Sequence, residues 1–379
     1  MKIVIAPDSF KESLTALEVA ASIERGIRKV IPNAEIVKVP MADGGEGTVQ
    51  SLIDSSQGSI VKAKVIGPMG NQVQAHFGLM GNSHTAVIEM ASASGIHLAE
   101  PENRNPLITT TFGTGQLIKA ALDLKVNHLI LGIGGSATND AGMGMCQALG
   151  IQFLDEEGNS LGYGGGELDK LAKIDLTNLD PRLANVTLEV ACDVTNPLCG
   201  PTGASHVFGP QKGATPEMIT RLDANLAHFA DVVLEQLGVD VKNIPGAGAA
   251  GGLGAALYGL LNATMKPGID IVIEATQLEQ AIQGADVVIT GEGRIDSQTI
   301  HGKTPSGVAK VCKAANIPVI GIAGCLSPDC AVVHDYGIDA VFDVVPGATD
   351  LQSALENASS NLELTARNVA ALLVMFNKQ

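Results

Sequence analysis

The chain has 379 residues, of which 45% are hydrophobic, and its net charge of −16 comes with a pI near 4.8 and no tryptophan. This length can bury substantial cores and suggests two or three domains of about 150 residues each. The acidic balance argues against a nucleic-acid-binding surface, because binding phosphate backbones requires a dense face of lysine and arginine. A small anionic substrate is still compatible if a few cations converge locally or a metal ion bridges the charges.

The cysteines and the N-terminus predict a cytoplasmic protein. Six cysteines lie far apart and form no CxxC pair, so neither a disulfide framework nor a zinc site is indicated. The N-terminal sequence MKIVIAPDSF breaks its apolar run after four residues, which is too short for the core of a signal peptide. The long uncharged stretch 245–265 opens with glycines and alanines, which offer little transfer energy to lipid. We expect a glycine loop there, followed by a buried helix.

Both ends of the chain have the pattern of a parallel α/β sheet. Residues 2–6 predict a buried strand, and residues 14–30 predict a helix with apolar positions near helical spacing. A second strand, EIVKVP, ends in MADGGEG and leads into a helix at Thr48. The C-terminal part repeats this style with strands at ADVVIT, PVIGIAG and DAVFDVV, a helix from about Thr304 and a closing helix over 351–376. Repeated strand, loop and helix units are typical of parallel sheets with crossovers.

The middle of the chain has a different texture. The segments VKAKVIG, QVQAHFGLM and TAVIEMA alternate apolar with polar residues and predict antiparallel strands. The α/β pattern then resumes, and one helix is well delimited by a Thr215 cap, Pro216 at its first position and a Gly238 stop. We therefore predict an α/β protein of two domains. Residues 1–57 plus 283–379 form a discontinuous Rossmann-like parallel-sheet domain, and residues 58–282 form an inserted α/β domain with an antiparallel β segment.

Five loops that follow predicted strands each carry at least one carboxylate, and ligands bind at this edge of open parallel sheets. The loops span residues 7–11, 43–47, 134–140, 193–196 and 291–296. An aspartate at a helix N-terminus also caps free amides, so capping explains any single loop equally well. Five acidic loops at one edge would repel each other without a cation, which favours Mg²⁺ together with phosphates.

The stretch GEGRIDSQT, residues 291–299, is predicted to be a glycine-hinged turn directly after the strand ADVVIT. Its Arg294 can fork onto a carboxylate or a phosphate, and Glu292 and Asp296 are candidates for metal binding or orientation. Lys303 is a further candidate partner for a phosphate or carboxylate. Lys212, in FGPQKGA, is interpreted as a solvated surface lysine when taken alone.

Three glycine patterns resemble nucleotide-binding motifs. The pattern Gly132-x-Gly134-x-x-Ala137 follows a strand and imitates a dinucleotide fingerprint, but Asp140 in the same loop would face a pyrophosphate. A nucleotide phosphate with a metal ion fits this loop better than a nicotinamide cofactor does. The segment GAGAAG at 246–251 follows a proline rather than a strand, which favours close helix packing. The sequence around Gly302-Lys303-Thr304 fails the P-loop pattern, because no glycine stands five residues before Gly302.

Taken together, several blocks resemble the bacterial type I glycerate kinases: APDSFKESL, MADGGEGT, GIGGSATNDAG, ACDVTNPLCGPTGA, FGPQKGA, PGAGAAGG and GEGRIDSQT. The resemblance runs in matching order along nearly the whole chain. It implies ATP-dependent phosphorylation of D-glycerate, typically at the 2-hydroxyl to give 2-phosphoglycerate. It also implies a two-domain α/β enzyme with its active site in the interdomain cleft. Nothing in the residues themselves fixes the 2-hydroxyl over the 3-hydroxyl.

Phosphoryl transfer assigns hypothetical roles to these loops. Asp193 accepts the proton of the glycerate hydroxyl or orients that hydroxyl, with turn capping as the alternative role. The substrate and the moving phosphoryl group are held by Arg294, Lys11, Lys303, Asp8 and Ser9. The ATP phosphates and nucleotide are held by Gly134, Gly135, Ser136 and Asn139. Mg²⁺ is held by Asp43 and Glu46, with Asp8 and Asp296 as alternative ligands.

Two other functions stay open on the sequence alone. One is a nicotinamide-dependent oxidoreductase of small hydroxy acids, and the other is a two-lobed protein that binds or senses a small acid. The expected partners are therefore small molecules, D-glycerate and ATP above all, with no nucleic acid and no membrane. A homo-oligomer is compatible with the sequence, which does not define the oligomeric state.

Overall fold

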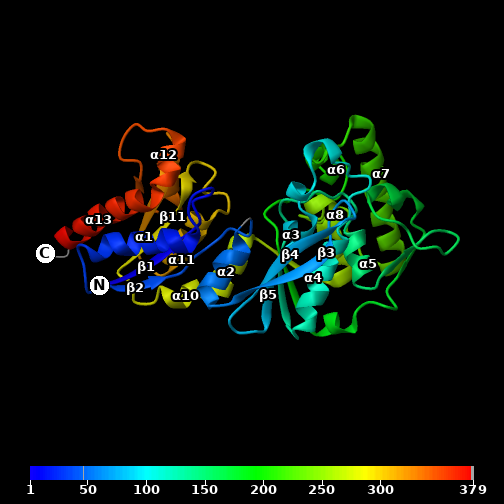
Figure 1. Ribbon diagram of the computed structural model, residues 1–379, viewed down its shortest axis with the longest axis horizontal. Helices are drawn as coiled ribbons and strands as arrows, with labels where there is room; N and C mark the ends of the chain where they lie inside the picture. The colour runs from blue at the N-terminus through cyan, green and yellow to red at the C-terminus, as the bar shows by residue number, and fades with distance from the viewer. Residues whose placement is uncertain (46, 377–379) are drawn as a thin grey trace. The chain divides into compact units, whose positions relative to one another are not determined.

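The structure, a computed structural model, is an α/β protein, and the predicted fold class is confirmed. It describes residues 1–45 and 47–376. The chain divides into two compact units (Figure 1): unit 1 comprises Met1–Gln57 and Pro267–Gln379, and unit 2 comprises Gly58–Lys266. We expected the chain to return to the first domain at residue 283, whereas residues 267–282 already belong to unit 1. The reason is that the two helices of this segment, Gly268–Thr276 and Leu278–Ala281, pack against other helices of unit 1.

Unit 1 is built on a five-stranded, wholly parallel sheet in the order β13-β12-β11-β1-β2. Its strands are β1 (Lys2–Pro7), β2 (Glu35–Lys38), β11 (Val287–Ile295), β12 (Val319–Leu326) and β13 (Ala340–Asp343). Its helices are α1 (Ala16–Arg28), α2 (Thr48–Ser56), α9 (Gly268–Thr276), α10 (Leu278–Ala281), α11 (Thr304–Ala314), α12 (Leu351–Glu356) and α13 (Ala358–Phe376), with a 3₁₀ segment at Cys330–Tyr336. Strands from the two ends of the chain thus form one sheet, in which β1 lies next to β11.

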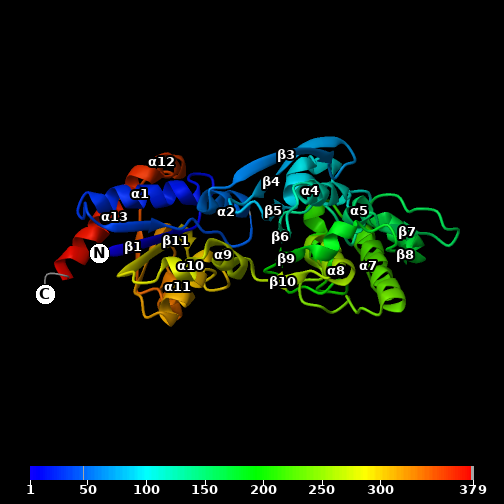
Figure 2. The same ribbon diagram turned by 90° about the horizontal axis from the view of Figure 1, so that it is seen from below.

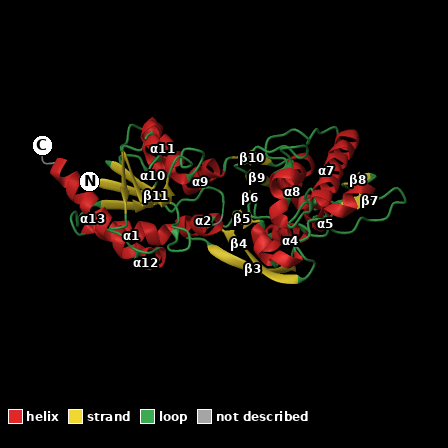
Figure 3. Ribbon diagram, turned by 90° about the horizontal axis from the view of Figure 1, so that it is seen from above, coloured by secondary structure: helices red, strands yellow, loops and turns green. Residues whose placement is uncertain are grey.

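Helices cover both faces of this sheet, as Figures 2 and 3 show, with α1 and α13 on one face and α11 on the other. The helix α1 begins at Thr15, whose side chain and that of Glu18 form a reciprocal capping box. Helices α1 and α13 approach closely at Gly26, where a Cβ atom would lie 2.3 Å from the carbonyl oxygen of Glu363. This contact joins the first helix of the chain to the last. Residues of both helices form one buried core cluster with Ile3 and Ile5 of β1.

Unit 2 contains a six-stranded mixed sheet in the order β10-β9-β6-β5-β4-β3. The strands β3 (Ser59–Ile66), β4 (Gln72–Leu79) and β5 (Thr85–Glu89) are antiparallel neighbours, as the alternating pattern predicts. The strands β5, β6 (His128–Gly132), β9 (Thr187–Ala191) and β10 (Thr264–Lys266) are parallel. A separate antiparallel pair consists of β7 (Gln152–Leu154) and β8 (Lys173–Asp175).

The helices of unit 2 enclose one large apolar core. They are α3 (Ala91–Ser94), α4 (Phe112–Asp123), α5 (Met143–Ala148), α6 (Ala204–Phe208), α7 (Pro216–Leu237) and α8 (Ala249–Leu261), with short 3₁₀ segments at Ile96–Leu98, Pro101–Asn103, Gly165–Lys170, Pro181–Asn185 and Pro210–Lys212. The well-delimited helix is α7, which begins after the Thr215 cap and ends at Gly238, as predicted. The buried helix α8 follows the glycine loop, also as predicted.

Two predicted elements of unit 1 were wrong in detail. The stretch GEGRI is not a turn: β11 continues through it to Ile295, because Glu292 and Arg294 pair with Ala323 and Cys325 of β12. Glycine and charged residues hide this continuation, since neither is typical of a buried strand. The closing helix is also interrupted, because α12 ends at Asn357 before α13 begins.

Among the described residues, no helix combines the length and apolar character needed to cross a membrane. All six cysteines are free thiols.

Candidate functional site

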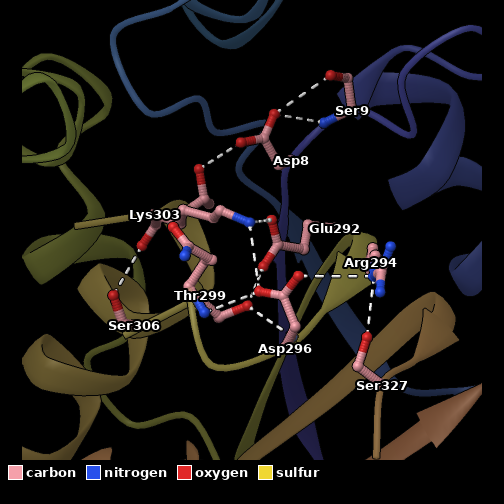
Figure 4. A network of polar contacts seen from close by, with 11 residues as sticks. Asp8, Ser9, Glu292, Arg294, Asp296, Thr299, Lys303, Ser306 and Ser327 are labelled. Atoms are coloured by element: carbon pink, nitrogen blue, oxygen red, sulfur yellow. Dashed lines mark hydrogen bonds and ion pairs between the residues drawn. The ribbon is translucent and has the colours of Figure 1, made fainter. Parts of the chain in front are cut away.

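The first group of candidate residues is assembled by the pairing of β1 with β11. In this pairing Pro7 lies opposite Gly291, and the amide of Asp8 donates to the Gly291 carbonyl at 2.8 Å. The residue after each partner, Asp8 or Glu292, therefore lies at the same edge of the sheet. Figure 4 shows Asp8, Glu292, Arg294, Asp296 and Lys303 gathered there. We call these five residues the unit 1 cluster.

Asp8 is held by hydrogen bonds to both of its carboxylate oxygens. The hydroxyl of Thr304, at the start of α11, donates to Oδ2 at 2.6 Å, and the backbone amide of Ser9 donates to Oδ1 at 2.6 Å. Burial, together with a smaller effect of the nearby charge of Asp43, raises the pKa of Asp8 to about 6, although the hydrogen bonds from Thr304 and Ser9 lower it. A carboxylate is thus kept partly desolvated beside a second carboxylate.

Glu292 lies at the centre of the cluster, and its side chain is 12% exposed. Its Oε1 accepts from the Thr299 hydroxyl at 2.6 Å, and its Oε2 lies 3.5 Å from Lys303 Nζ. Burial raises the pKa of Glu292 to about 7; the charge of Asp8 adds to this, while Thr299 and Lys303 oppose it. This carboxyl group therefore changes charge near neutral pH, as many functional carboxyl groups do.

Arg294 and Lys303 supply the positive charge of the cluster. The Nε of Arg294 donates to Ser327 Oγ at 2.9 Å and lies 3.5 Å from Asp296 Oδ2, while its side chain is 65% exposed. Lys303 Nζ lies between Glu292 and Asp296, 3.8 Å from Asp296 Oδ1. The guanidinium is therefore anchored at one edge and open to solvent over most of its surface, an arrangement suited to binding an anion.

The other predicted residues of unit 1 occupy varied positions. Ser9 follows Asp8 and bonds to it, whereas the side chain of Lys11 is exposed in the next turn. Asp43 Oδ1 accepts from the amide of Gly45 at 3.0 Å. Glu46 lies outside the described residues. Thr304, which donates a hydrogen bond to Asp8, was not selected from the sequence, where its place after Gly302-Lys303 was the available signal.

The second group of candidates lies in unit 2, on the loop that follows β6. Gly134 and Gly135 are exposed, and Gly135 has a φ of +70°, a left-handed value that glycine adopts easily. Ser136 is buried, and it forms an isolated bridge with Gly95. The side chain of Asn139 is fully buried, with Oδ1 accepting from Ser205 Oγ at 3.3 Å. Asn139 thus supports the loop from inside, and its predicted role in nucleotide binding stays a prediction.

The same loop ends in a buried carboxylate. Asp140 accepts from the amide and hydroxyl of Thr111 and from the amides of Gly142 and Gly144, at 2.8–3.3 Å. Burial raises the pKa of Asp140, although these donors lower it. The glycine segment after Pro245 packs against this loop, since a Cβ on Gly251 would lie 2.0 Å from the Thr138 carbonyl oxygen. Close packing is therefore the role of this glycine motif that the structure displays.

Lys212 is buried rather than solvated, so our interpretation of it from the sequence was wrong. Only 2% of the residue is exposed, and its Nζ donates to Ser136 Oγ at 2.7 Å and to the Thr138 carbonyl at 2.6 Å. The reason is that Lys212 lies in a 3₁₀ turn, Pro210–Lys212, and reaches the glycine loop from the inside. The one signal of this turn in the sequence was the residues around Lys212, with FGPQ before it and a glycine after it.

Asp193 lies beyond the end of the neighbouring strand β9. In the sheet Gly132 of β6 pairs with Ala191 of β9, so Gly134 and Asp193 each follow their paired residue by two positions. Asp193 is exposed, and the next loop residues are fixed by Asn196, whose Nδ2 donates to the Thr202 carbonyl at 2.8 Å. The adjacent strands therefore bring Asp193 to the same edge as the glycine loop.

The oxygen-rich chemistry of Asp8 and Asp43 is compatible with Mg²⁺, although residues 1–45 and 47–376 contain no group of three His, Cys, Asp or Glu that could hold a metal ion. Mg²⁺ commonly uses one or two carboxylates and completes its shell with phosphate and water. The predicted ligands Asp43, Glu46 and Asp296 stay a prediction.

Comparisons with known proteins identify the family. A model of the glycerate kinase family matches residues 3–374. The chain belongs to the glycerate kinase family. A Bacillus subtilis protein named glycerate kinase is 60% identical over 98% of this chain and 97% of its own length. An Escherichia coli protein named glycerate 2-kinase is 56% identical over 99% of this chain and 98% of its own length. A crystal structure from Salmonella typhimurium LT2, provisionally named glycerate kinase 2, covers 100% of both chains with a TM-score of 0.93 and 55% identity.

Because the chain belongs to the glycerate kinase family, both groups of residues are candidates for a role in the same activity. The family name denotes a kinase, and the resemblance seen in the sequence motifs is confirmed. It leaves the oxidoreductase interpretation of Gly132-x-Gly134-x-x-Ala137 without support.

The raised pKa of Glu292 predicts how the stability of this glycerate kinase family member depends on pH. A carboxyl group with a raised folded-state pKa contributes stability that is complete below its unfolded pKa, near 4.5, and is lost as the pH rises through about 7. We expect Glu292→Gln to raise the melting temperature by a few degrees at pH 8.5. The gain should shrink at pH 5.5, where much of the wild-type carboxyl group is already protonated.

Thermal unfolding of both proteins across this pH range tests the prediction. Glu279→Gln, at an exposed position of α10, controls for the change in net charge. A gain at pH 8.5 that is no larger than the gain at pH 5.5 would contradict it.

Proposed function

We propose that the protein is a glycerate 2-kinase that transfers the γ-phosphoryl group of ATP to the 2-hydroxyl of D-glycerate, giving 2-phosphoglycerate and ADP. The observation that carries this proposal is the near full-length match to the Escherichia coli protein named glycerate 2-kinase. Phosphorylation at the 3-hydroxyl is the alternative. We further propose that the enzyme acts in the cytoplasm, where ATP is available.

In the proposed reaction, the unit 1 cluster binds the glycerate carboxylate and the transferring phosphoryl group. Arg294 is anchored by Ser327 through Nε, which leaves its terminal nitrogens to form paired hydrogen bonds with an anion. Lys303 and Lys11 add positive charge, and Asp8 and Ser9 orient the hydroxyl groups of the substrate. Cations that face the developing negative charge lower the barrier to transfer without having to reorganise.

The loops of unit 2 are proposed to bind the nucleotide and to accept the proton. The amides of Gly134, Gly135 and Ser136 bind ATP phosphates, because consecutive backbone amides beside glycines form an anion-binding concavity. Asp193 accepts the proton of the 2-hydroxyl as its oxygen bonds to the γ-phosphorus, while the bond to the β-phosphate oxygen breaks and ADP leaves.

The same proposal assigns Mg²⁺ to Asp43 and Glu46, with Asp296 as an alternative ligand. When bound, Mg²⁺ would neutralise charge on the nucleotide phosphates. The nearby Asp8, with its pKa raised to about 6 by burial and by Asp43, supports a cation at this edge, because a positive charge relieves the repulsion between carboxylates.

Phosphorus NMR of the wild-type protein with Mg-ATP and D-glycerate tests the function. We expect loss of ATP, formation of ADP and a new phosphomonoester signal. Coupling to one proton would make this signal a doublet and identify the 2-phosphate, whereas coupling to two protons would make it a triplet and identify the 3-phosphate. Absence of any glycerate-dependent ADP would contradict the kinase proposal, and a rise in melting temperature with NAD(H) but not Mg-ATP would favour an oxidoreductase.

The role of Asp193 predicts a specific kinetic defect. Asp193→Asn preserves the size of the side chain but removes the proton acceptor, so kcat should fall by about 10²-fold or more. The dissociation constant of Mg-ATP should stay within about twofold of the wild-type value. Turnover close to wild type would remove Asp193 from the mechanism and leave turn capping as its role.

The role of Arg294 predicts a defect in substrate binding. Arg294→Lys keeps the charge but loses the planar fork, so the KM for D-glycerate should rise by about tenfold, while the KM for ATP should change little. Ser327→Ala, which removes only the anchor on Nε, should give a smaller change in the same direction. Unchanged KM for glycerate in Arg294→Lys would make Arg294 a structural residue.

A further inference from the structure

We propose that Lys212 is a positioning residue that holds the glycine loop 134–136 in the conformation that binds the phosphates of the nucleotide. This inference rests on the proposed function, and it adds a residue that reaches the nucleotide site from inside the protein.

Lys212 bonds to the two sides of the loop. Its Nζ donates to the hydroxyl of Ser136 at 2.7 Å and to the carbonyl of Thr138 at 2.6 Å. The backbone around Lys212 is itself fixed, because its amide donates to the Gly209 carbonyl and the next residue, Gly213, has a φ of +86°. One side chain therefore ties a fixed turn to two successive segments of the glycine loop.

The burial of Lys212 costs free energy, and the hydrogen bonds of its side chain do not fully offset this cost. In the described part of the chain no carboxylate forms an ion pair with Lys212, and both of its partners are neutral oxygens. Burial lowers the pKa of Lys212 to about 7, although the charge of Asp140 opposes this. The oxygens of Asp140 are already occupied by Thr111, Gly142 and Gly144. A buried cation without an ion pair is a weak source of stability, so a role in the loop accounts better for its presence.

The loop that Lys212 holds is exposed at Gly134 and Gly135. Across the described residues, no protein acceptor bonds to the amides of Gly134, Gly135 or Ser136. The inner side of the loop is bonded: the Gly135 carbonyl accepts from Ile96, and the amide of Ala137 donates to Ser94. A Cβ on Gly134 would meet nothing within 4 Å, so space for a ligand lies directly above the loop. In its protonated form, Lys212 places a positive charge at Ser136, next to these amides, which adds to their attraction for phosphate.

Binding measurements with Mg-ADP and with D-glycerate separate this role from general destabilisation. With Lys212→Met, we expect the dissociation constant of Mg-ADP to rise by about tenfold or more, because a hydrogen bond to a charged group is lost. The dissociation constant of D-glycerate, which the proposed function places in unit 1, should change by less than about twofold. A purely structural role would weaken both ligands together or neither.

Two further variants make the test complete. Ser136→Ala removes the hydroxyl that accepts from Lys212 and should weaken Mg-ADP by a smaller factor, and the double variant should be no weaker than Lys212→Met alone, because both act through one bond. Lys119→Met, at an exposed position of α4, is the matched control and should bind both ligands like the wild type.

Circular dichroism and melting temperature verify that each variant is folded. If folded Lys212→Met binds Mg-ADP within about twofold of the wild type, the proposal is wrong. If Lys212→Met does not fold, Ser136→Ala decides: selective loss of Mg-ADP affinity supports the proposal, and unchanged affinity overturns it. Failure of the wild type to bind Mg-ADP or to phosphorylate glycerate would instead reject the proposed function.

Discussion

The parallel pairing of β1 with β11 is the constraint on which unit 1 depends. It joins the N-terminal strand to a strand that follows more than two hundred residues later, and the whole of unit 2 lies between these two strands in the sequence. The pairing of Pro7 with Gly291 also sets the register that brings Asp8 and Glu292 to one edge. A shift of one residue would turn every side chain to the opposite face and separate the two carboxylates.

Each unit loses stability at its candidate site, because charged groups there are kept away from water. In unit 1, burial raises the pKa values of Asp8 and Glu292 to about 6 and about 7, and in unit 2 burial lowers the pKa of Lys212 to about 7. These groups lower stability relative to apolar side chains of similar size. The proposed function gives a reason for this loss of stability, because polar groups that are held in place before the substrates arrive need not reorganise during the reaction.

The sequence predicted the elements whose signals are local and missed those that depend on distant partners. The ends of α7 followed from Thr215, Pro216 and Gly238, which act within a few residues of each other. The continuation of β11 through GEGRI depends on pairing with β12, and no pattern within the stretch itself shows this. The burial of Lys212 likewise depends on acceptors at Ser136 and Thr138, more than seventy positions away.

This difference explains why the two sites were predicted unequally. The acidic loops of unit 1 stand directly after strands, so the general position of ligand sites in parallel sheets was enough to select Asp8 and the GEGRIDSQT stretch. In unit 2 the same rule selected the exposed glycines but not the lysine behind them, because a lysine is normally solvated. A buried lysine is informative for the same reason, because its burial costs free energy. The oxygens that accept its hydrogen bonds define one conformation of the loop, and solvent-exposed contacts would hold that conformation less tightly.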